Sequence, residues 1–161
     1  MSELRVGIGV DAHALAEGVP LVLGGVRFEH PRGLVGHSDG DVLAHALIDA
    51  LLGAAGLEDI GALFPSDEPE WQGAASLDLL ARAYELVREA GWELVNADCV
   101  LIGEEPRIAP YRGEMRRRLA AAVGVEPARV AVRATTTDGL GFTGRGEGLA
   151  AHAVALVRRP G

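Results

Sequence analysis

Residues 42–57 (VLAHALIDALLGAAGL) form the apolar stretch that decides the fold of this 161-residue chain. Only His45 and Asp49 interrupt it, so the sequence predicts a helix that is apolar on almost every side, as a buried helix is. Ser38 or Asp39 offers an N-cap, because a side-chain oxygen there accepts hydrogen bonds from the first free backbone amides. A helix of this kind requires a sheet or other helices to cover it.

Strands and further helices are predicted on both sides of the buried helix. Alternating or β-branched residues predict strands. Ser76 offers an N-cap, and the apolar residues at helical spacing after it predict a second helix that ends at Gly91. The predicted strands cover residues 4–10, 94–102, 129–135 and 149–157, with an extended stretch at 20–29 that bends at Gly24 and Gly25; the further helices cover 77–90 and 110–123. We therefore expect an α+β fold, with one domain over residues 1–161 and a mixed β-sheet covered by helices on one face.

The composition excludes several classes of protein. With 15 Lys+Arg, all of them Arg, against 23 Asp+Glu, the net charge is −8, so the chain lacks the positive field that attracts nucleic acid or anionic membranes. Without lysine it has no Walker A or Schiff-base lysine. Its single cysteine, Cys99, allows neither an internal disulfide nor a multi-thiolate zinc site. The N-terminus leaves no room for a signal peptide and no apolar run is long enough for a membrane span, so we expect a cytoplasmic protein.

Ionisable residues on the buried helix indicate a metal site. Asp41, His45 and Asp49 are spaced by four residues and therefore form one stripe, where a charge must be paired, protonated or bound to metal. Asp11 and His13, two residues apart at the end of the first strand, point to the same side. Together with His45 they supply the three protein ligands of a catalytic zinc site. Asp41 or Asp49 would then hold the other ring nitrogen of His45.

Two other interpretations of these residues stay open. The same ligand set suits a non-haem iron centre, because both metals accept imidazole and carboxylate ligands. Alternatively, Asp11 and His13 belong to an ordinary turn at the end of a strand, and His45 forms a hydrogen bond with Asp49 within the helix.

Three further segments have the composition of binding loops. Residues 134–148 (ATTTDGLGFTGRGEG) combine threonine hydroxyls, exposed amides and Arg145, which suit phosphate oxygens, with Asp138, which suits a hard cation; a mobile glycine-rich connection is the alternative. His37 and Ser38 lie before the buried helix, where anions bind, although capping alone also explains them. Residues 59–68 (DIGALFPSDE) form a lid or a simple loop.

Four motifs resemble one enzyme family. VGIGVDAH at 6–13, GHSDGDVLAHALIDALLGAAGLEDIGALFP at 36–65, EEPRIAPYRGEM at 104–115 and ATTTDGLGFTGRGEG at 134–148 occur in order and cover most of the chain. They resemble the 2-C-methyl-D-erythritol 2,4-cyclodiphosphate synthases. The resemblance implies a cytoplasmic lyase of non-mevalonate isoprenoid biosynthesis. This enzyme converts 4-diphosphocytidyl-2-C-methyl-D-erythritol 2-phosphate into the 2,4-cyclodiphosphate and CMP.

The resemblance also implies the roles of individual residues. Asp11, His13 and His45 would bind Zn²⁺ or another divalent transition metal, and Asp138 would bind a second cation, Mg²⁺ or Mn²⁺, at the diphosphate. His37 and Thr136 would stabilise the transition state. The implied substrate-binding residues are Asp11, His13, His37, Ser38, Asp59, Ile60, Gly61, Phe64, Pro65, Ser66, Asp67, Glu68, Gly103, Glu104, Glu105, Pro106, Arg107, Ile108, Ala109, Ala134, Thr135, Thr136, Thr137, Asp138, Phe142 and Arg145.

Members of this family are homotrimers, so the resemblance implies active sites between subunits. The metal half and the cytidine half of one site would come from different chains. The segment around Phe142, Arg145 and Glu147 would face the trimer axis, where some members bind an isoprenoid diphosphate. The chain departs from the family at Asp138, where Glu is usual, and at Arg107, where Lys is common and a planar guanidinium binds differently.

Two alternative functions stay open beside this one. A zinc-dependent hydrolase of a phosphorylated small molecule would use the same three ligands to activate water and would need a general base near the metal. A non-catalytic trimer that binds isoprenoid diphosphates would use the metal for its structure alone.

Overall fold

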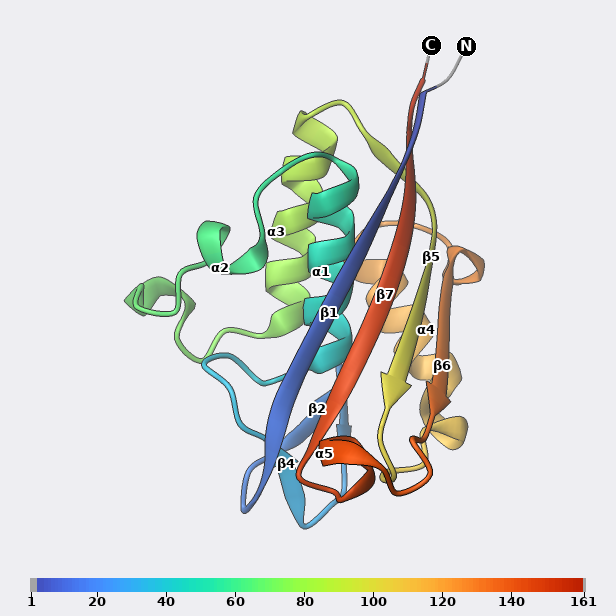
Figure 1. The fold of residues 1–161 in the computed structure, drawn as a ribbon. Coiled ribbons are helices and arrows are strands. Elements are labelled where there is room, and N and C mark those ends of the chain that lie inside the picture. Colours follow the sequence, from blue (N-terminus) through green and yellow to red (C-terminus); the bar gives the residue numbers. More distant parts are fainter. Residues whose placement is uncertain (1–2, 161) are drawn as a thin grey trace.

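Two long antiparallel strands, β1 (Glu3–Glu17) and β7 (Gly148–Arg159), form the centre of the sheet in the computed structural model, which describes residues 3–160. The strand order is β4-β1-β7-β5-β6. Strand β5 (Glu93–Ile102) runs antiparallel to β7, β6 (Val130–Thr135) runs parallel to β5, and the short β4 (Arg32–Leu34) pairs with the end of β1. The expected mixed sheet is confirmed (Figure 1).

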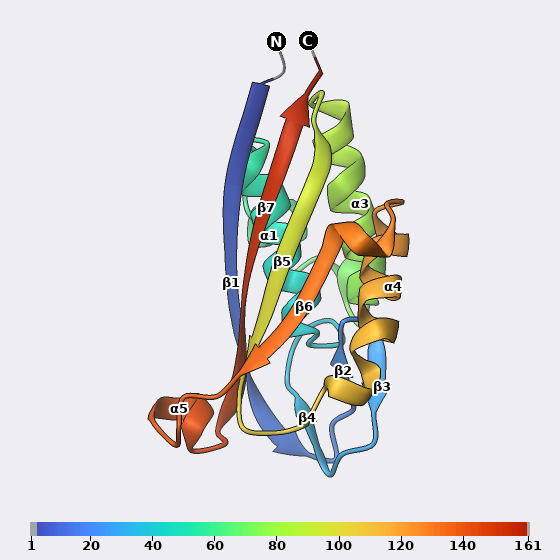
Figure 2. The same ribbon diagram turned by 90° about the vertical axis from the view of Figure 1, so that its right-hand side faces the viewer.

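Three helices cover one face of this sheet: α1 (Val42–Ala54), α3 (Ser76–Glu89) and α4 (Arg112–Ala122) (Figure 2). Helix α1 packs on β1 and β7, α3 packs on α1, and α4 packs on β6. Eleven of the 13 residues of α1 are buried, which confirms the fully apolar helix expected from the sequence. No helix within residues 3–160 is long and apolar enough to cross a bilayer.

Short elements connect these layers. The stretch expected to be one bent strand at 20–29 is a hairpin of β2 (Leu21–Leu23) and β3 (Val26–Phe28), because Gly24 and Gly25 both have positive φ and form a tight turn. The helix predicted at 110–123 divides into a 3₁₀ turn, Ala109–Tyr111, and α4. The sequence did not predict β4, α2 (Ile60–Leu63), α5 (Gly141–Gly144) or the 3₁₀ turns Pro69–Trp71 and Pro127–Arg129.

Asp41, and not Ser38 or Asp39, caps helix α1. Its carboxylate accepts from the backbone amide of Ala44 at 3.1 Å and from the amides of Gly24 and Gly25 at 2.9 and 2.7 Å. Asp41 is fully buried, and burial raises its pKa to about 6, although the three amide donors oppose that rise. The residue therefore joins the β2–β3 turn to α1 and is not free to support His45.

Glycines in β1 allow α1 to lie directly on the strand. A Cβ at Gly9 would overlap the carbonyl oxygen of Ala46, and a Cβ at Gly7 would overlap that of Ala50. The backbones of helix and strand therefore approach more closely than any side chain permits. This approach fixes the height of the first turns of α1 above β1.

We expect Gly9→Ala to lower the free energy of unfolding by more than about 3 kcal/mol, because the added methyl group must displace the backbone of a buried helix. Urea unfolding midpoints at one protein concentration measure the effect. Gly53→Ala is the matched control: it lies in α1 itself, its new Cβ would meet only backbone atoms at 3.9 and 4.0 Å, and it should be neutral or slightly stabilising. Equal midpoints for the two variants would contradict the expectation.

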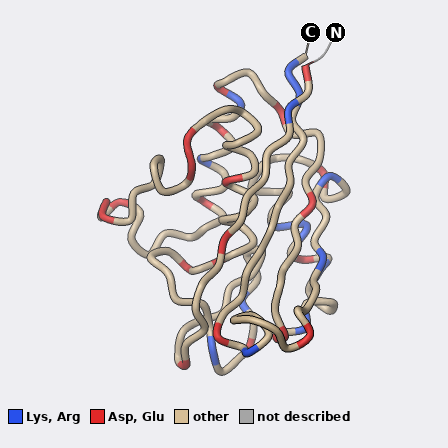
Figure 3. The backbone as a smooth tube through the Cα atoms, viewed as in Figure 1, with Lys and Arg blue, Asp and Glu red and all other residues tan. Residues whose placement is uncertain are grey.

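The face of the sheet opposite the helices is uncovered, and it is apolar along β1, whereas Asp98 and Arg133 form an ion pair on its β5–β6 side. Four alternate residues of β1 point there, with exposed fractions of 60% for Leu4, 67% for Val6, 64% for Ile8 and 55% for Val10. Val154 of β7 adds to this outer face with an exposed fraction of 43%. Charged residues occur on β7 only at its end (Figure 3). A continuous apolar patch of this kind is typical of a surface that another protein chain covers.

Candidate metal centre and substrate pocket

Strand β1 and helix α1 bring Asp11, His13 and His45 together. The Asp11 Oδ2 atom lies 2.8 Å from His13 Nε2 and 3.0 Å from His45 Nδ1, and the two ring nitrogens are 3.2 Å apart. Asp11 and His13 point to the helix-covered side, as expected for residues two apart in a strand. They do not lie at a strand end, however, because the pairing of β1 with β7 continues to Ala14.

The hydrogen bonding of His13 leaves one of its nitrogens free for a metal. His13 Nδ1 lies 2.8 Å from the carbonyl oxygen of Val35, which can only accept, so Nδ1 carries the hydrogen and Nε2 has a free lone pair. That lone pair faces the Asp11 carboxylate and the Nδ1 atom of His45. Three such acceptor atoms at this spacing require a cation or a proton between them.

The pKa values of Asp11 and His13 are shifted by their contact with each other. For Asp11, burial alone would raise the pKa, but hydrogen bonds from His13 and His45 outweigh it and lower the pKa to about 2. The hydrogen bond with Asp11 raises the pKa of His13, against the opposing effect of burial. Both shifts favour a proton on His13 beside an ionised Asp11, so metal binding competes with that proton.

The three ligand atoms fit a transition metal with an open coordination position. They all lie within 4.8 Å of one another, and within residues 3–160 no other group of three His, Cys, Asp or Glu side chains meets this condition. Two imidazoles and one carboxylate suit zinc or another divalent transition metal, and three protein ligands leave a position for substrate. A pocket of about 270 Å³ opens in front of them.

The second ring nitrogen of His45 faces serines and not aspartates. His45 Nε2 lies 2.8 Å from Ser76 Oγ and 3.0 Å from Ser38 Oγ. The expectation that Asp41 or Asp49 holds this nitrogen is wrong: Asp41 caps α1, and Asp49 accepts from the backbone amide of Ile60 at 2.8 Å. Ser76, read from the sequence as an N-cap, is the first residue of α3 and its side chain turns to His45 instead.

The pocket brings together part of the predicted substrate site. Besides the metal ligands, its predicted lining residues are His37, Ser38, Ile60, Gly61, Phe64 and Ser66. Trp71 and Leu79 also line the pocket and were not predicted. The rings of Trp71 and Phe64 pack edge to face, with 4.9 Å between their centroids. An isolated tryptophan in an acidic, proline-containing segment was the available signal. Asp59 caps the short helix α2 by accepting from the amide of Ala62, and Pro65, Asp67 and Glu68 are not among the lining residues.

The remaining predicted residues gather where the parallel strands β5 and β6 end. The amide of Gly103 donates to the carbonyl of Thr135 at 3.0 Å, and the amide of Gly139 donates to Glu104 at 3.0 Å. Gly103 and Glu104 therefore lie beside residues 135–139. Thr135 and Thr136 are exposed there, whereas the side chain of Ile108 is buried in the core.

Asp138 adopts a left-handed conformation with φ 53° beside Thr136. Its amide donates to Thr136 Oγ1 at 3.2 Å, and its carboxylate lies 3.4 Å from the same oxygen. Thr137 turns away and donates to the carbonyl of Leu140. Phe142 lies on α5 with 43% of its surface exposed, and Arg145 pairs with Glu147 at 3.1 Å.

The metal ligands and this strand edge do not meet within one chain. Register places Asp11 opposite Ala151, Ala151 opposite Leu101, and Leu101 opposite Ala134. The row spans three strand spacings, so the backbones of Asp11 and Ala134 are about 14 Å apart. The pocket at the metal ligands contains no residue from 103–109 or 134–138.

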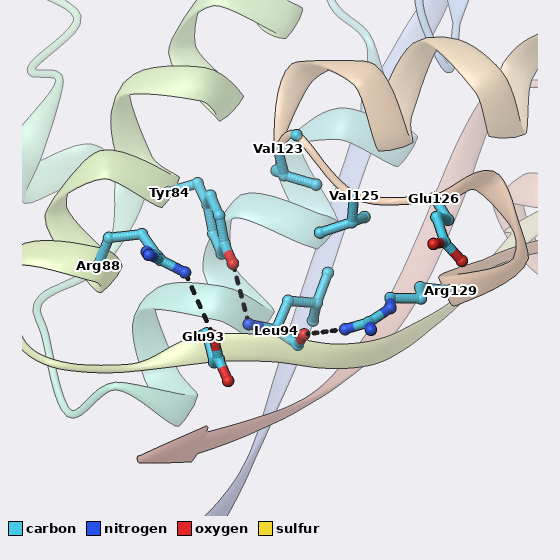
Figure 4. Close-up of a pocket in the computed structure, with 9 residues that line it drawn as sticks. Tyr84, Arg88, Glu93, Leu94, Val123, Val125, Glu126 and Arg129 are labelled. Atoms are coloured by element: carbon cyan, nitrogen blue, oxygen red, sulfur yellow. Dashed lines mark hydrogen bonds and ion pairs between the residues drawn. The ribbon is translucent and has the colours of Figure 1, made fainter. Parts of the chain in front are cut away.

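A second hollow of about 410 Å³ lies between the ends of α3 and α4 (Figure 4). Arg88 pairs with Glu93 there, Arg129 donates to the carbonyl of Leu94, and the hydroxyl of Tyr84 accepts from the amide of Leu94. These polar groups join α3, β5 and the segment after α4. The hollow therefore has a structural explanation, whereas the smaller pocket holds the converging metal ligands.

Fold and site together define an α+β domain with a candidate metal centre between a mixed sheet and a buried helix. The chain belongs to the YgbB family, whose model matches residues 4–158. It is 59% identical to the 2-C-methyl-D-erythritol 2,4-cyclodiphosphate synthase of Rubrobacter xylanophilus, over 99% of this chain and 98% of the relative.

Solved structures agree with this assignment. The chain is similar to the bifunctional IspDF of Campylobacter jejuni, with 42% identity and a TM-score of 0.95; the match covers 99% of this chain and 43% of the larger protein. It is also similar to a CDP-bound 2C-methyl-D-erythritol-2,4-cyclodiphosphate synthase, with 39% identity, a TM-score of 0.87, and coverage of 95% and 99% of the two chains.

Proposed function

We propose that this chain is a 2-C-methyl-D-erythritol 2,4-cyclodiphosphate synthase. The enzyme converts 4-diphosphocytidyl-2-C-methyl-D-erythritol 2-phosphate into the cyclic diphosphate and CMP in isoprenoid precursor biosynthesis. The observation that carries the proposal is the cluster of Asp11, His13 and His45 in a chain that matches such synthases over nearly its full length. The similarity favours this function over a hydrolase or a binding module.

The pocket beside the metal ligands would hold the erythritol and phosphate end of the substrate. His37 and Ser38 lie at its rim before α1, where backbone amides and the helix dipole favour anions. Residues 59–61 and 64–68 would form the outer wall, and the packing of Phe64 on Trp71 gives that wall an apolar base. The pocket would thus orient the 2-phosphate and keep water from it.

The other half of the active site would come from a neighbouring subunit of a homotrimer. Two observations support this arrangement: the apolar outer face of β1 and β7 requires a cover, and the two halves are about 14 Å apart within one chain. The cytidine would bind along residues 103–109 and 134, and the diphosphate would bind at Thr135, Thr136 and Thr137.

Catalysis would consist mainly of positioning. The 2-phosphate of the bound substrate attacks its own β-phosphorus and CMP leaves, so the reaction needs no nucleophile from the protein. His37 from one subunit and Thr136 from the next would donate hydrogen bonds to oxygens that gain charge in the transition state. When bound, zinc would polarise the β-phosphate, and Mg²⁺ or Mn²⁺ would neutralise charge on the departing CMP.

Asp138 would hold the second cation. The family usually has Glu at this position, whose side chain is one methylene longer. The left-handed backbone of Asp138 places its carboxylate 3.4 Å from the hydroxyl of Thr136. Arg107, in place of the usual Lys, would bind the nucleotide phosphates through a planar fork of donors.

We place the protein in the cytoplasm, where its buried free thiol, Cys99, suits a reducing environment. The α5 segment with Phe142 and Arg145 would face the trimer axis and an isoprenoid diphosphate bound there.

Phosphorus-31 NMR of the purified protein with substrate, Zn²⁺ and Mg²⁺ tests the proposal. We expect two spin-coupled diphosphate signals from the cyclic product, together with CMP, and their loss after chelation and return when both metals are restored. Release of inorganic phosphate or a linear diphosphate would instead identify a hydrolase. Unchanged substrate with intact trimer and bound metal would favour a binding module.

A further inference from the structure

The hydroxyl of Ser76 connects His45 to an aspartate that does not contact the metal ligands. Ser76 is fully buried. Its Oγ lies 2.8 Å from His45 Nε2 and 3.2 Å from Ser38 Oγ, and it donates to the Asp39 carboxylate. A serine hydroxyl has a single hydrogen, so the direction in which that hydrogen points decides the role of each partner.

Asp39 sets this direction. One carboxylate oxygen accepts from the backbone amide of Ser76 at 3.0 Å, and the other faces Ser76 Oγ. An ionised carboxylate has no hydrogen to give, so the hydroxyl hydrogen of Ser76 must point to Asp39. The lone pairs of Ser76 Oγ then remain for His45, whose Nε2 must be the donor.

The tautomer of His45 follows from this chain of hydrogen bonds. If Nε2 carries the hydrogen, the neutral ring has a bare Nδ1, and Nδ1 is the atom that faces Asp11 and His13. Asp11 favours a hydrogen on Nδ1, which would block the metal, so the hydrogen bond to Ser76 opposes that effect of Asp11. We infer that Asp39 is a positioning residue that acts through Ser76 to hold His45 in the tautomer whose Nδ1 can bind metal. The inference rests on the proposed metal centre and extends it to two residues outside the ligand set.

A structural role of Asp39 must be separated from this one. Ala75, at the N-cap position of α3, provides no side-chain cap, and the bond from the Ser76 amide to Asp39 takes its place. Ser76→Ala keeps that backbone bond and removes only the hydroxyl. The Asp39 oxygen that faces Ser76 Oγ also accepts from the backbone amide of Asp41 at 3.1 Å. Asp39→Asn keeps an oxygen for the Ser76 amide and turns its NH₂ group to Ser76 Oγ, so that it loses the Asp41 bond, and Ser76 then donates to His45 and favours the wrong tautomer.

Two measurements on purified protein test the inference without reference to turnover. Nitrogen-15 NMR of the histidine rings in metal-free protein reports which nitrogen of His45 carries hydrogen, and competition with a chromophoric chelator gives the zinc dissociation constant. We expect the Nε2–H form in the wild type, a shift to the Nδ1–H form in Asp39→Asn, and zinc binding about 10- to 100-fold weaker in that variant.

A double-mutant cycle shows whether Asp39 acts through Ser76. Ser76→Ala should weaken zinc binding less than Asp39→Asn, because Ser38 still accepts from His45 Nε2. In the Ser76→Ala background, Asp39→Asn should then have little further effect on zinc affinity. An undiminished effect of Asp39→Asn in that background would overturn the inference.

Asp78→Asn is the matched control, because it likewise replaces a carboxylate near the start of α3 by an amide, but Asp78 lies in the first turn of that helix and outside this chain of hydrogen bonds. It should leave both the His45 tautomer and zinc affinity unchanged. Equal losses of zinc affinity for Asp39→Asn and Asp78→Asn, or an unaltered His45 tautomer in Asp39→Asn, would refute the positioning role. Absence of zinc binding by the wild type would refute the metal centre, and the ring tautomer would still decide the inference on its own.

Discussion

His45→Ala should abolish zinc binding and lower the turnover of substrate by at least about 1000-fold, since a bound metal supplies several kcal/mol of transition-state stabilisation. Removal of the ring leaves Asp11 and His13 as a two-ligand site. The fold should survive, because the side chain lies at the pocket end of α1 and the helix keeps its Asp41 cap. Metal analysis after dialysis, together with the phosphorus-31 assay, measures both losses.

Sedimentation provides the structural readout for His45→Ala. The variant should sediment like the wild type, as the proposed trimer, and a loss of assembly in the variant alone would show that the metal serves the structure instead. His30→Ala is the control for metal content: its ring contacts the carbonyl of Arg32 and the side chain of Glu105, away from the cluster. That variant should keep its full zinc content.

Two inactive variants should restore activity to each other if the active site lies between subunits. His45→Ala damages the metal half, and Thr136→Ala damages the diphosphate half. In a trimer that contains both chains, a site that takes its metal half from the Thr136→Ala chain and its diphosphate half from the His45→Ala chain has neither lesion. In a ring of three like interfaces, each mixed trimer has one such site, about a third of its sites.

Co-expression with two affinity tags isolates the mixed trimers, whose activity is compared with that of each variant alone. A mixture of His45→Ala with Asp11→Ala is the control, because both lesions lie in the metal half and no arrangement repairs them. Confirmed mixed trimers of His45→Ala and Thr136→Ala without activity would contradict the intersubunit site. The substrate would then have to reach from the metal half at Asp11 to the diphosphate half beside Ala134 within one chain.

The local features of the fold were predictable from the sequence. The apolar run at 42–57 predicted α1, and the spacing of Asp11 and His13 predicted two side chains on one face of a strand. Both follow from short-range periodicity, which a single sequence contains in full. The ligand cluster could be predicted because the buried apolar run contains only two ionisable residues, His45 and Asp49.

Long-range partners could not be predicted in the same way. Asp41 or Asp49 was expected to support His45, and Ser38 or Asp39 to cap the helix. In the structure Asp41 caps α1, and Asp39 bonds to Ser76, 37 positions away. Strand β4 also escaped prediction, since three residues carry no periodicity. Such choices depend on which amides the fold brings near, and spacing along the chain does not specify them.

Strand β1 uses both of its faces. Its odd-numbered residues include the glycines beneath α1 and the ligands Asp11 and His13, and its even-numbered residues from Leu4 to Val10 form the apolar outer face. An insertion or deletion of one residue near the start of β1 would exchange these faces over the shifted part of the strand. The close packing on α1 and the proposed assembly of subunits would then both be lost through one change. Related chains should therefore vary in β1 by substitution and keep its length, whereas the segment 65–75, which no strand pairing constrains, can change in length.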